Sequence, residues 1–191
     1  MKIIIASDIH GSAHATRALV QRIETEQAER ILLLGDLLYH GPRNALPRDY
    51  DPAAVAAILN ERAAITTAVK GNCEAEVDQW MLDFPCEAAY ALIVDGKRTL
   101  FATHGHRPRM TPDEPPALPE GSAFLFGHTH VKLLERRGGI AFVNPGSVAL
   151  PKDDSASYAV YEDGAFELKA LDDGALLARL DLDNAREEPE P

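Results

Sequence analysis

The chain has few cysteines, no long apolar segment and no excess of positive charge. Only two of its 191 residues are cysteines, Cys73 and Cys86, which are too few for a disulfide framework. No apolar stretch approaches the roughly 18 residues that a membrane helix needs, and the N-terminal run "KIIIAS" is too short for a signal peptide. We therefore expect a cytoplasmic protein without a membrane anchor.

The net charge of −11 restricts the partners of the chain. A nucleic-acid backbone or an anionic membrane, as a general partner, needs a basic face, so both are excluded. A small phosphate ester stays compatible if a metal ion supplies positive charge locally. The length and the 46% of hydrophobic residues fit one well-filled core. We expect a single domain over residues 1–182, followed by an acidic, disordered tail over 183–191.

The first third of the chain alternates between predicted strands and helices. Apolar, β-rich runs lie at 2–7, 30–35 and 65–71. Helical spacing of apolar residues predicts helices at 13–27 and 51–63, the second with Asp51 as N-cap and Pro52 at its first position. This order is typical of parallel strands joined by helices that cover the sheet.

The second half of the chain is predicted to be largely antiparallel. Hairpins are expected over 89–105, 123–147 and 157–171, with turns at Asp95-Gly96, Gly138-Gly139 and Asp163-Gly164. The Pro-rich segment 107–121 is expected to be a loop. Together the two halves predict one layered α/β (α+β) domain with two sheets and flanking helices.

Five predicted strands end in polar residues, mostly beside a glycine: Asp8 and His10, Asp36, Asn72, His104 and His106, and His128 and His130. In open α/β sheets ligands bind outside the carboxyl ends of strands, so these side chains can converge on one rim. The spacing of two in Asp8/His10 and His128/His130 keeps both side chains on one face if the local backbone is extended.

Carboxylate, amide and imidazole donors together suit Mn²⁺, Fe, Zn²⁺ or Co²⁺ better than Ca²⁺. The set has two carboxylates, one amide and four or five imidazoles, depending on His106. Even seven ligands are too many for one ion and suit two ions that share a carboxylate, for which Asp36 is the central candidate. Each element alone has a simpler explanation, because Asp8 could be a helix N-cap and Gly35-Asp36 a turn. The combination, in this order and at strand ends, indicates a metal site.

The ordered motifs Asp8-x-His10, Gly35-Asp36, Gly71-Asn72, His104 and Gly127-His128-x-His130 resemble the calcineurin-like metallophosphoesterase family over residues 3–152. Segments 33–47, 71–79 and 142–152 are similar, more narrowly, to its bacterial YfcE-type phosphodiesterases. The resemblance implies a two-sheet β-sandwich flanked by helices and two divalent ions, first of all Mn²⁺. One ion would be held by Asp8, His10, Asp36 and His130, and the other by Asp36, Asn72, His104 and His128.

The resemblance also implies a reaction, in which a hydroxide bridging the two ions attacks a small phosphodiester. Asn72 would additionally donate a hydrogen bond to a phosphoryl oxygen. Cys73 stands where many relatives carry histidine, and is either a weak acid beside the leaving group or a buried filler. Arg43 is either a contact to a substrate phosphate or a solvated loop charge. His106 is a ligand, a pocket residue or a simple loop histidine.

Two other functions are compatible with this resemblance. One is a non-catalytic interaction scaffold, since the retromer scaffold subunit resembles the fold but lacks part of the metal set. The other is a phosphomonoesterase or dinucleoside-polyphosphate hydrolase of the same superfamily. Every ligand position here carries a competent ligand, which weighs against the scaffold. The sequence leaves a homo-oligomer open.

Overall fold

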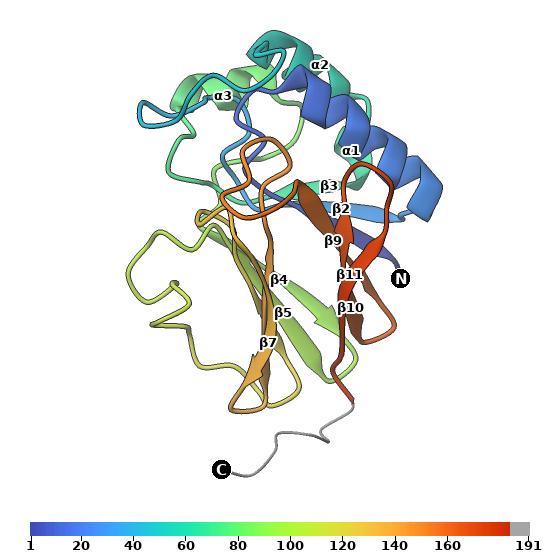
Figure 1. The fold of residues 1–191 in the computed structure, drawn as a ribbon. Coiled ribbons are helices and arrows are strands. Elements are labelled where there is room, and N and C mark those ends of the chain that lie inside the picture. Colours follow the sequence, from blue (N-terminus) through green and yellow to red (C-terminus); the bar gives the residue numbers. More distant parts are fainter. Residues whose placement is uncertain (184–191) are drawn as a thin grey trace.

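In the computed structural model, which describes residues 1–183, two β-sheets pack face to face and helices cover the outer face of one of them (Figure 1). The helices are α1 (Ala13–Glu26), α2 (Pro52–Asn60) and α3 (Glu76–Met81), with a short 3-10 turn at Ala63–Ile65. None of them is long and apolar enough to cross a bilayer. The predicted two-sheet sandwich with flanking helices is confirmed.

The first sheet joins the two ends of the chain. Its order is β11-β10-β9-β1-β2-β3, with β1 (Ile3–Ala6), β2 (Arg30–Leu33), β3 (Thr66–Ala68), β9 (Ser157–Glu162), β10 (Ala165–Ala170) and β11 (Leu176–Asp181). β1, β2 and β3 are parallel, as their sequence predicts, whereas β9 returns antiparallel to β1. β11 is an edge strand that the sequence did not predict.

The second sheet has the order β4-β5-β6-β8-β7, with β4 (Tyr90–Asp95), β5 (Arg98–Thr103), β6 (Ala123–Leu125), β7 (Lys132–Arg137) and β8 (Ile140–Pro145). Here the prediction of a largely antiparallel half is wrong for three strands, because β5, β6 and β8 run parallel. The long loop 104–122 returns the chain to the start of the sheet before β6 begins. Three parallel carboxyl ends therefore meet at one edge of this sheet too.

Two of the three predicted hairpin turns are confirmed. Arg137 pairs with Ile140 around the two glycines, and Glu162 pairs with Ala165 around Asp163-Gly164. The first is shifted by one residue, because Asp95 still pairs with Arg98 and leaves Gly96 and Lys97 as the loop. The expected disordered tail lies outside the described residues except for Asp183, which forms an ion pair with Arg98.

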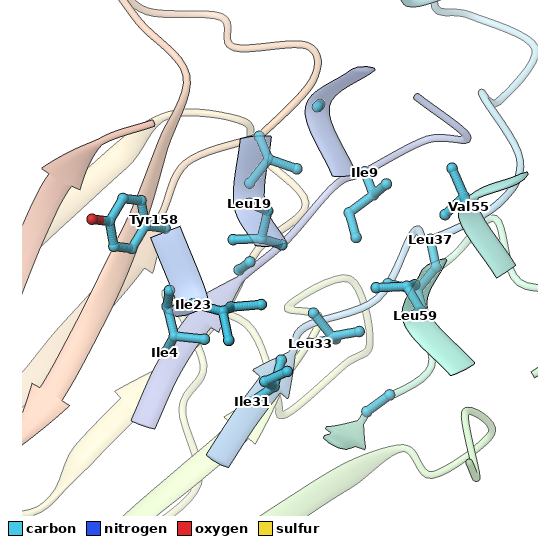
Figure 2. Close-up of a cluster of buried hydrophobic side chains, with 14 of the residues drawn as sticks. Ile4, Ile9, Leu19, Ile23, Ile31, Leu33, Leu37, Val55, Leu59 and Tyr158 are labelled. Atoms are coloured by element: carbon cyan, nitrogen blue, oxygen red, sulfur yellow. The ribbon is translucent and has the colours of Figure 1, made fainter. Parts of the chain in front are cut away.

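The buried core has three parts, stacked through the molecule. Between the helices and the first sheet, α1 and α2 place Leu19, Ile23, Val55 and Leu59 over Ile4 and the neighbouring strands (Figure 2). A second cluster fills the space between the sheets, and a third joins four phenylalanines on the outer face of the second sheet to Met110 and Leu118 of the Pro-rich loop. Because β1 is buried on both faces, its run of isoleucines is continuous rather than alternating.

The start of α2 follows the predicted capping chemistry, and α1 begins in a similar way. Asp51 precedes α2 and its side chain accepts a hydrogen bond from the amide of Ala54, with Pro52 at the first helical position. Ser12 caps α1 in the same way through the amide of Ala15. α1 thus begins only three residues after His10, so the chain passes directly from β1 through the candidate site into the covering helix.

Candidate metal centre

The candidate residues lie where the parallel strands of both sheets end. In the first sheet, β1 leads into Asp8 and His10, β2 into Asp36, and β3 into Asn72. In the second sheet, β5 leads into His104, and β6 into His128 and His130. Two backbone hydrogen bonds of 3.1 Å join neighbouring loops. The Asp8 amide donates to Gly35 O, and the Gly127 amide donates to His104 O. The predicted convergence on one rim is thus observed.

The local backbone at these positions is left-handed rather than extended. Five of the seven donors have a positive φ: Asp8 (57°), His10 (49°), Asp36 (55°), His128 (67°) and His130 (61°). The expectation that a spacing of two works through extended backbone is therefore wrong. Each loop turns sharply as it leaves its strand, and this turn directs both members of a pair toward the same centre.

The first group of donors is Asp8, His10 and His130. The Nε2 atoms of the two rings lie 3.1 Å apart. Asp8 Oδ1 lies 3.2 Å from His130 Nε2 and 3.6 Å from His10 Nε2. All three side chains are buried, and Asp8 Oδ1 has no hydrogen-bond partner among the described residues. A buried carboxylate oxygen facing two ring nitrogens is a competent site for a cation.

Asp36 lies between the first group and the second. Its Oδ2 atom is 3.7 Å from His10 Nε2 and 3.5 Å from His104 Nε2. Its Oδ1 atom accepts a hydrogen bond of 2.8 Å from the amide of Cys73, which fixes the plane of the carboxylate. The position between two imidazoles is the one that a shared ligand requires.

The second group adds an amide and a half-buried imidazole. Asn72 Oδ1 lies 3.1 Å from His104 Nε2. The ring of His128 stands edge-on to that of His104, with centroids 5.2 Å apart, and the His128 amide donates to Asp8 Oδ2 at 3.1 Å. Asn72 is exposed and His128 half-buried, whereas Asp8, His10 and His130 of the first group are all buried. This group is therefore the more accessible of the two.

Three of the rings are oriented by backbone carbonyl oxygens, which can only accept. The Nδ1 atoms donate as follows: His10 to Tyr39 at 2.8 Å, His104 to Leu34 at 2.7 Å and His130 to Leu150 at 2.6 Å. In the neutral rings each Nε2 then carries a lone pair directed at the centre. Lone pairs of His10 and His130 facing each other across 3.1 Å repel unless a cation lies between them, so the residues present fit a divalent ion.

The charges of the site reinforce one another. Burial raises the pKa of Asp8, but the adjacent rings of His10 and His130 outweigh it, so the pKa lies below its ordinary value. Burial lowers the pKa of His104, but the carboxylates of Asp36 and Asp8 raise it by more, so the resulting pKa is about 9. The site thus binds positive charge strongly, whether a proton or a metal ion.

Glu74 has a different place from the one its sequence indicates. At the sequence level its carboxylate fits the start of the next helix, but α3 begins at Glu76 and Glu74 is buried. It accepts hydrogen bonds from three backbone amides: Asp36 at 3.0 Å, Leu37 at 2.6 Å, and Gly71. Glu74 therefore ties the loop after β2 to the loop after β3. The residues next to Glu74 in the sequence are typical of a turn, so they did not predict this role.

Two further buried residues, to which sequence reasoning gave no role, hold the loops from the side of β8. Asn144 donates to Gly127 O at 2.9 Å and to Thr129 Oγ1 at 3.0 Å, which fixes the loop that carries His128 and His130. Ser147 donates to Asp8 O at 2.7 Å. Both residues lie in the segment "FVNPGSVALPK", which resembles the family, but the resemblance gave neither of them a role.

Three other predicted residues surround the site at different distances. Cys73 and Arg43 line an open pocket together with Asn72 and His128. Cys73 is half-buried. Its burial and, next, the charge of Asp36 raise the pKa of its thiol to about 12, so the thiol is protonated near pH 7. His106 is not among the pocket-lining residues; its ring packs against His104, with centroids 5.3 Å apart.

Comparisons with known proteins agree with this arrangement. A family model described as the calcineurin-like phosphoesterase superfamily domain matches residues 1–163. Phosphodiesterase YfcE of Escherichia coli strain K12 is 44% identical over 181 residues, which cover 94% of this chain and 97% of that protein. The solved structure of Yfce, a phosphoesterase from E. coli, matches with a TM-score of 0.92 at 42% identity, over 96% of this chain and 100% of that chain.

More distant proteins share the fold. The probable metallophosphoesterase YsnB of Bacillus subtilis is 29% identical over 166 residues, covering 84% of this chain and 83% of that protein. Vps29 of Entamoeba histolytica, solved in complex with Zn²⁺, is similar at a TM-score of 0.58 and 19% identity, over 96% of this chain and 100% of that chain, which shows the fold alone. The family model and the relative at 44% identity lead to one conclusion: this chain belongs to the calcineurin-like phosphoesterase superfamily.

Proposed function

We propose that this chain is a metal-dependent phosphodiesterase that hydrolyses a small phosphodiester at a centre of two divalent ions. The observation that carries the proposal is the convergence of oxygen and nitrogen donors, most of them buried, from five strand ends, with Asp36 between two imidazoles. The similarity to the protein named Phosphodiesterase YfcE, at 44% identity over 94% of the chain, supports the same reaction.

In this proposal Asp8, His10 and His130 hold one ion, Asn72, His104 and His128 hold the other, and Asp36 binds both. Mn²⁺ is the first candidate for both positions, and Fe, Zn²⁺ or Co²⁺ are alternatives that suit the same donors. Divalent ions bound there would acidify a water molecule for in-line attack on phosphorus and neutralise the developing phosphate charge. Their charge outweighs that of the two carboxylates, so an anionic substrate can enter an acidic protein.

The side chains that face the pocket would bind and orient the ester. The oxygen of Asn72 is directed at His104, and its amide nitrogen lies 3.2 Å from Cys73 Sγ at the pocket surface, where it can donate to a phosphoryl oxygen. The protonated thiol of Cys73 is a weak acid beside the leaving group. A diester with an acidic leaving group depends little on such a proton donor, which favours diesters over monoesters.

The test compares bis(p-nitrophenyl) phosphate with p-nitrophenyl phosphate for the Mn²⁺-loaded protein. We expect metal-dependent turnover of the diester, faster than that of the monoester. Asp36→Asn should abolish turnover while the fold persists, because Asn retains the acceptor for the Cys73 amide and tolerates a φ of 55°. Asp163→Asn, at an exposed aspartate with a φ of 49°, is the matched control and should remain active.

A protein that neither binds Mn²⁺ nor turns over the diester would instead support the scaffold hypothesis. Faster hydrolysis of the monoester would support a phosphomonoesterase. A single domain over residues 1–182 is proposed because strands from both halves of the chain line the core between the sheets. The cytoplasmic location and a homo-oligomer stay predictions, as does a role for His106, which the geometry places beside His104.

A further inference from the structure

The pocket over the proposed metal centre has a positively charged rim, although the chain as a whole is acidic. It has a volume of about 440 Å³, and its polar lining includes Asp36, Arg43, Asn72, His128 and Lys152. Asp36 is the only carboxylate among the lining residues, in a chain whose net charge is −11. Arg43 and Lys152 are exposed, and neither forms an ion pair within residues 1–183. A pocket lined in this way favours anions beyond the one that the metal ions would bind.

The loop that carries Arg43 is fixed by the first donor group. The carbonyl oxygen of Tyr39 accepts from His10 Nδ1 at 2.8 Å. The following turn is closed by Asn44, whose side chain donates to His40 O at 2.8 Å and whose amide donates to Gly41 O at 3.3 Å. Arg43 therefore projects from a turn with a defined position relative to His10.

The segment that carries Lys152 is fixed by the other ring of the same pair. The Lys152 amide donates to His130 O at 3.0 Å, and Leu150 O accepts from His130 Nδ1 at 2.6 Å. The Leu150 amide donates to Ser147 Oγ at 2.9 Å, and Ser147 in turn binds the backbone of Asp8. Lys152 thus starts from backbone that is hydrogen-bonded directly to a proposed metal ligand.

The two cations are therefore carried by two loops, each tied to one of two imidazoles whose Nε2 atoms are 3.1 Å apart. Other cations of the chain, such as Lys132, Arg98 and Lys169, are neutralised by carboxylates within 3 Å. Arginine presents a fork of donors that matches phosphate, and lysine supplies a mobile point charge. A phosphate group reaching out from the metal centre would meet both.

We propose that Arg43 and Lys152 form a second anion subsite, which accepts a further phosphate group on one ester arm of the substrate. This inference rests on the proposed phosphodiesterase activity and specifies its substrate class: a phosphodiester with an additional phosphate, in place of one whose arms are uncharged. The reacting phosphodiester would lie at the metal centre and the additional phosphate between the two cations at the pocket rim.

The first test uses a matched pair of chromogenic diesters, thymidine 5′-(p-nitrophenyl phosphate) and its 3′-phosphorylated derivative. We expect kcat/KM to be about fivefold higher for the phosphorylated substrate, mainly through a lower KM, which is the scale of an exposed charge pair. The preference should shrink as ionic strength rises, because the subsite is open to solvent. Equal kcat/KM values for the two substrates would overturn the subsite while leaving the phosphodiesterase activity established.

The variants separate these two cations from general charge effects. Lys152→Met and Arg43→Met should each lower the preference for the phosphorylated substrate toward unity, and Lys152→Arg should restore it. Lys97→Met is the control, because Lys97 is an exposed lysine on the β4–β5 turn, away from this pocket. A preference that survives in both single variants and in the double variant would contradict the assignment.

A binding measurement decides the inference independently of turnover. Calorimetry should give a dissociation constant for thymidine 3′,5′-bisphosphate about fivefold lower than that for thymidine 5′-phosphate, both with Mn²⁺ and with the metal removed. Lys152→Met should remove most of the difference. If the Mn²⁺-loaded protein hydrolyses neither diester, the proposed function fails, and the ratio of the two dissociation constants still tests the subsite. Equal dissociation constants would reject it.

Discussion

At the scale of single residues, the site is made by side chains in an unfavourable backbone conformation. Each left-handed residue other than glycine costs about 1–2 kcal/mol, and five such residues meet at this centre. Strain of this kind persists only where the surroundings determine it, here through the loop hydrogen bonds and Glu74. The sequence predicted which residues meet. It could not predict the backbone conformation that brings them together, because φ at Asp8 or His128 depends on contacts with distant loops.

Gly71 is a residue whose lack of a side chain the site requires. A Cβ at this position would collide with Asp36 Oδ1 and lie 2.5 Å from both the Asp36 amide and Glu74 Oε2. We expect Gly71→Ala to displace Asp36 and to lower kcat/KM by about tenfold or more, which is the cost of about 1.4 kcal/mol in the transition state. Gly96→Ala is the control: nothing lies within 4 Å of its Cβ, so its φ of 60° should lower stability and leave turnover intact.

Cys73 stands at the position where the family resemblance implies a histidine in many members. Because its thiol is protonated and a poor acid, an imidazole with an ordinary pKa of about 6.5 would donate a proton to the leaving group far better near pH 7. We expect Cys73→His to raise hydrolysis of p-nitrophenyl phosphate relative to bis(p-nitrophenyl) phosphate. Cys73→Ser, which provides no imidazole, should show no such gain. An unchanged ratio in Cys73→His would mean that the thiol does not stand beside the leaving group.

At the scale of elements, strand ends have to be held in register before side chains can converge. Glu74 does this for β2 and β3 by accepting from the amides of Asp36, Leu37 and Gly71. Its burial, with the neighbouring charge of Asp36, raises its pKa to about 7, and the amides of Leu37 and Asp36 limit that rise. Local sequence shows only a carboxylate in a turn, since its partners lie 37 and 38 residues away.

Glu74→Gln replaces one of these acceptor oxygens by an amide donor that faces a backbone N–H. We expect a loss of about 1–3 kcal/mol in the free energy of unfolding of the metal-free protein, the cost of leaving a buried group unpaired. The variant should also bind Mn²⁺ more weakly, because Asp36 is no longer held. Urea unfolding and Mn²⁺ titration measure the two effects. Glu76→Gln, on the exposed first turn of α3, should change neither; wild-type stability and affinity in Glu74→Gln would contradict the link.

Glu26 joins the end of α1 to the first sheet and gives a pH-dependent stability. It accepts from Tyr158 at 2.9 Å and Lys169 at 2.6 Å, and these partners outweigh burial and hold its pKa below the ordinary 4.5. Its contribution is therefore present above pH 4.5 and is lost as the pH falls through the lower folded pKa. We expect Glu26→Gln to lower stability by about 1 kcal/mol at pH 7.

The difference between wild type and Glu26→Gln should close as the pH is lowered through the folded pKa of Glu26, which urea unfolding at several pH values can follow. A difference that stays constant down to pH 2 would show that the effect is packing rather than charge. Glu61→Gln, at a side chain that is 72% exposed, serves as the control and should have a smaller effect.

At the scale of the whole molecule, two sheets bring three parallel strand ends each to one rim. The first set follows from the βαβ pattern of the sequence. The second does not, because β5, β6 and β8 are joined by a loop and a hairpin rather than by helices, and such connections are typical of antiparallel sheets. β11 was missed for a similar reason: it is an exposed edge strand without a strong apolar pattern.

In the proposed function, the acidic charge of the whole chain makes phosphate binding depend on metal ions. Asp8 and Asp36 repel phosphate until divalent ions outweigh them, and within residues 1–183 the cations on the pocket rim are Arg43 and Lys152. The sequence predicted the seven proposed donors because each of them directly follows a strand that its apolar run already marks. It gave no role to Lys152, because a single lysine after a loop has no pattern of its own.

The central claim is that two ions share Asp36, and anomalous diffraction from Mn²⁺-soaked crystals tests it most directly. The account predicts two peaks, each about 2.0–2.3 Å from its ligand atoms, one beside Asp8, His10 and His130 and the other beside Asn72, His104 and His128. Asp36 should contact both. A single peak, two peaks that do not share Asp36, or no peak at this rim would contradict it.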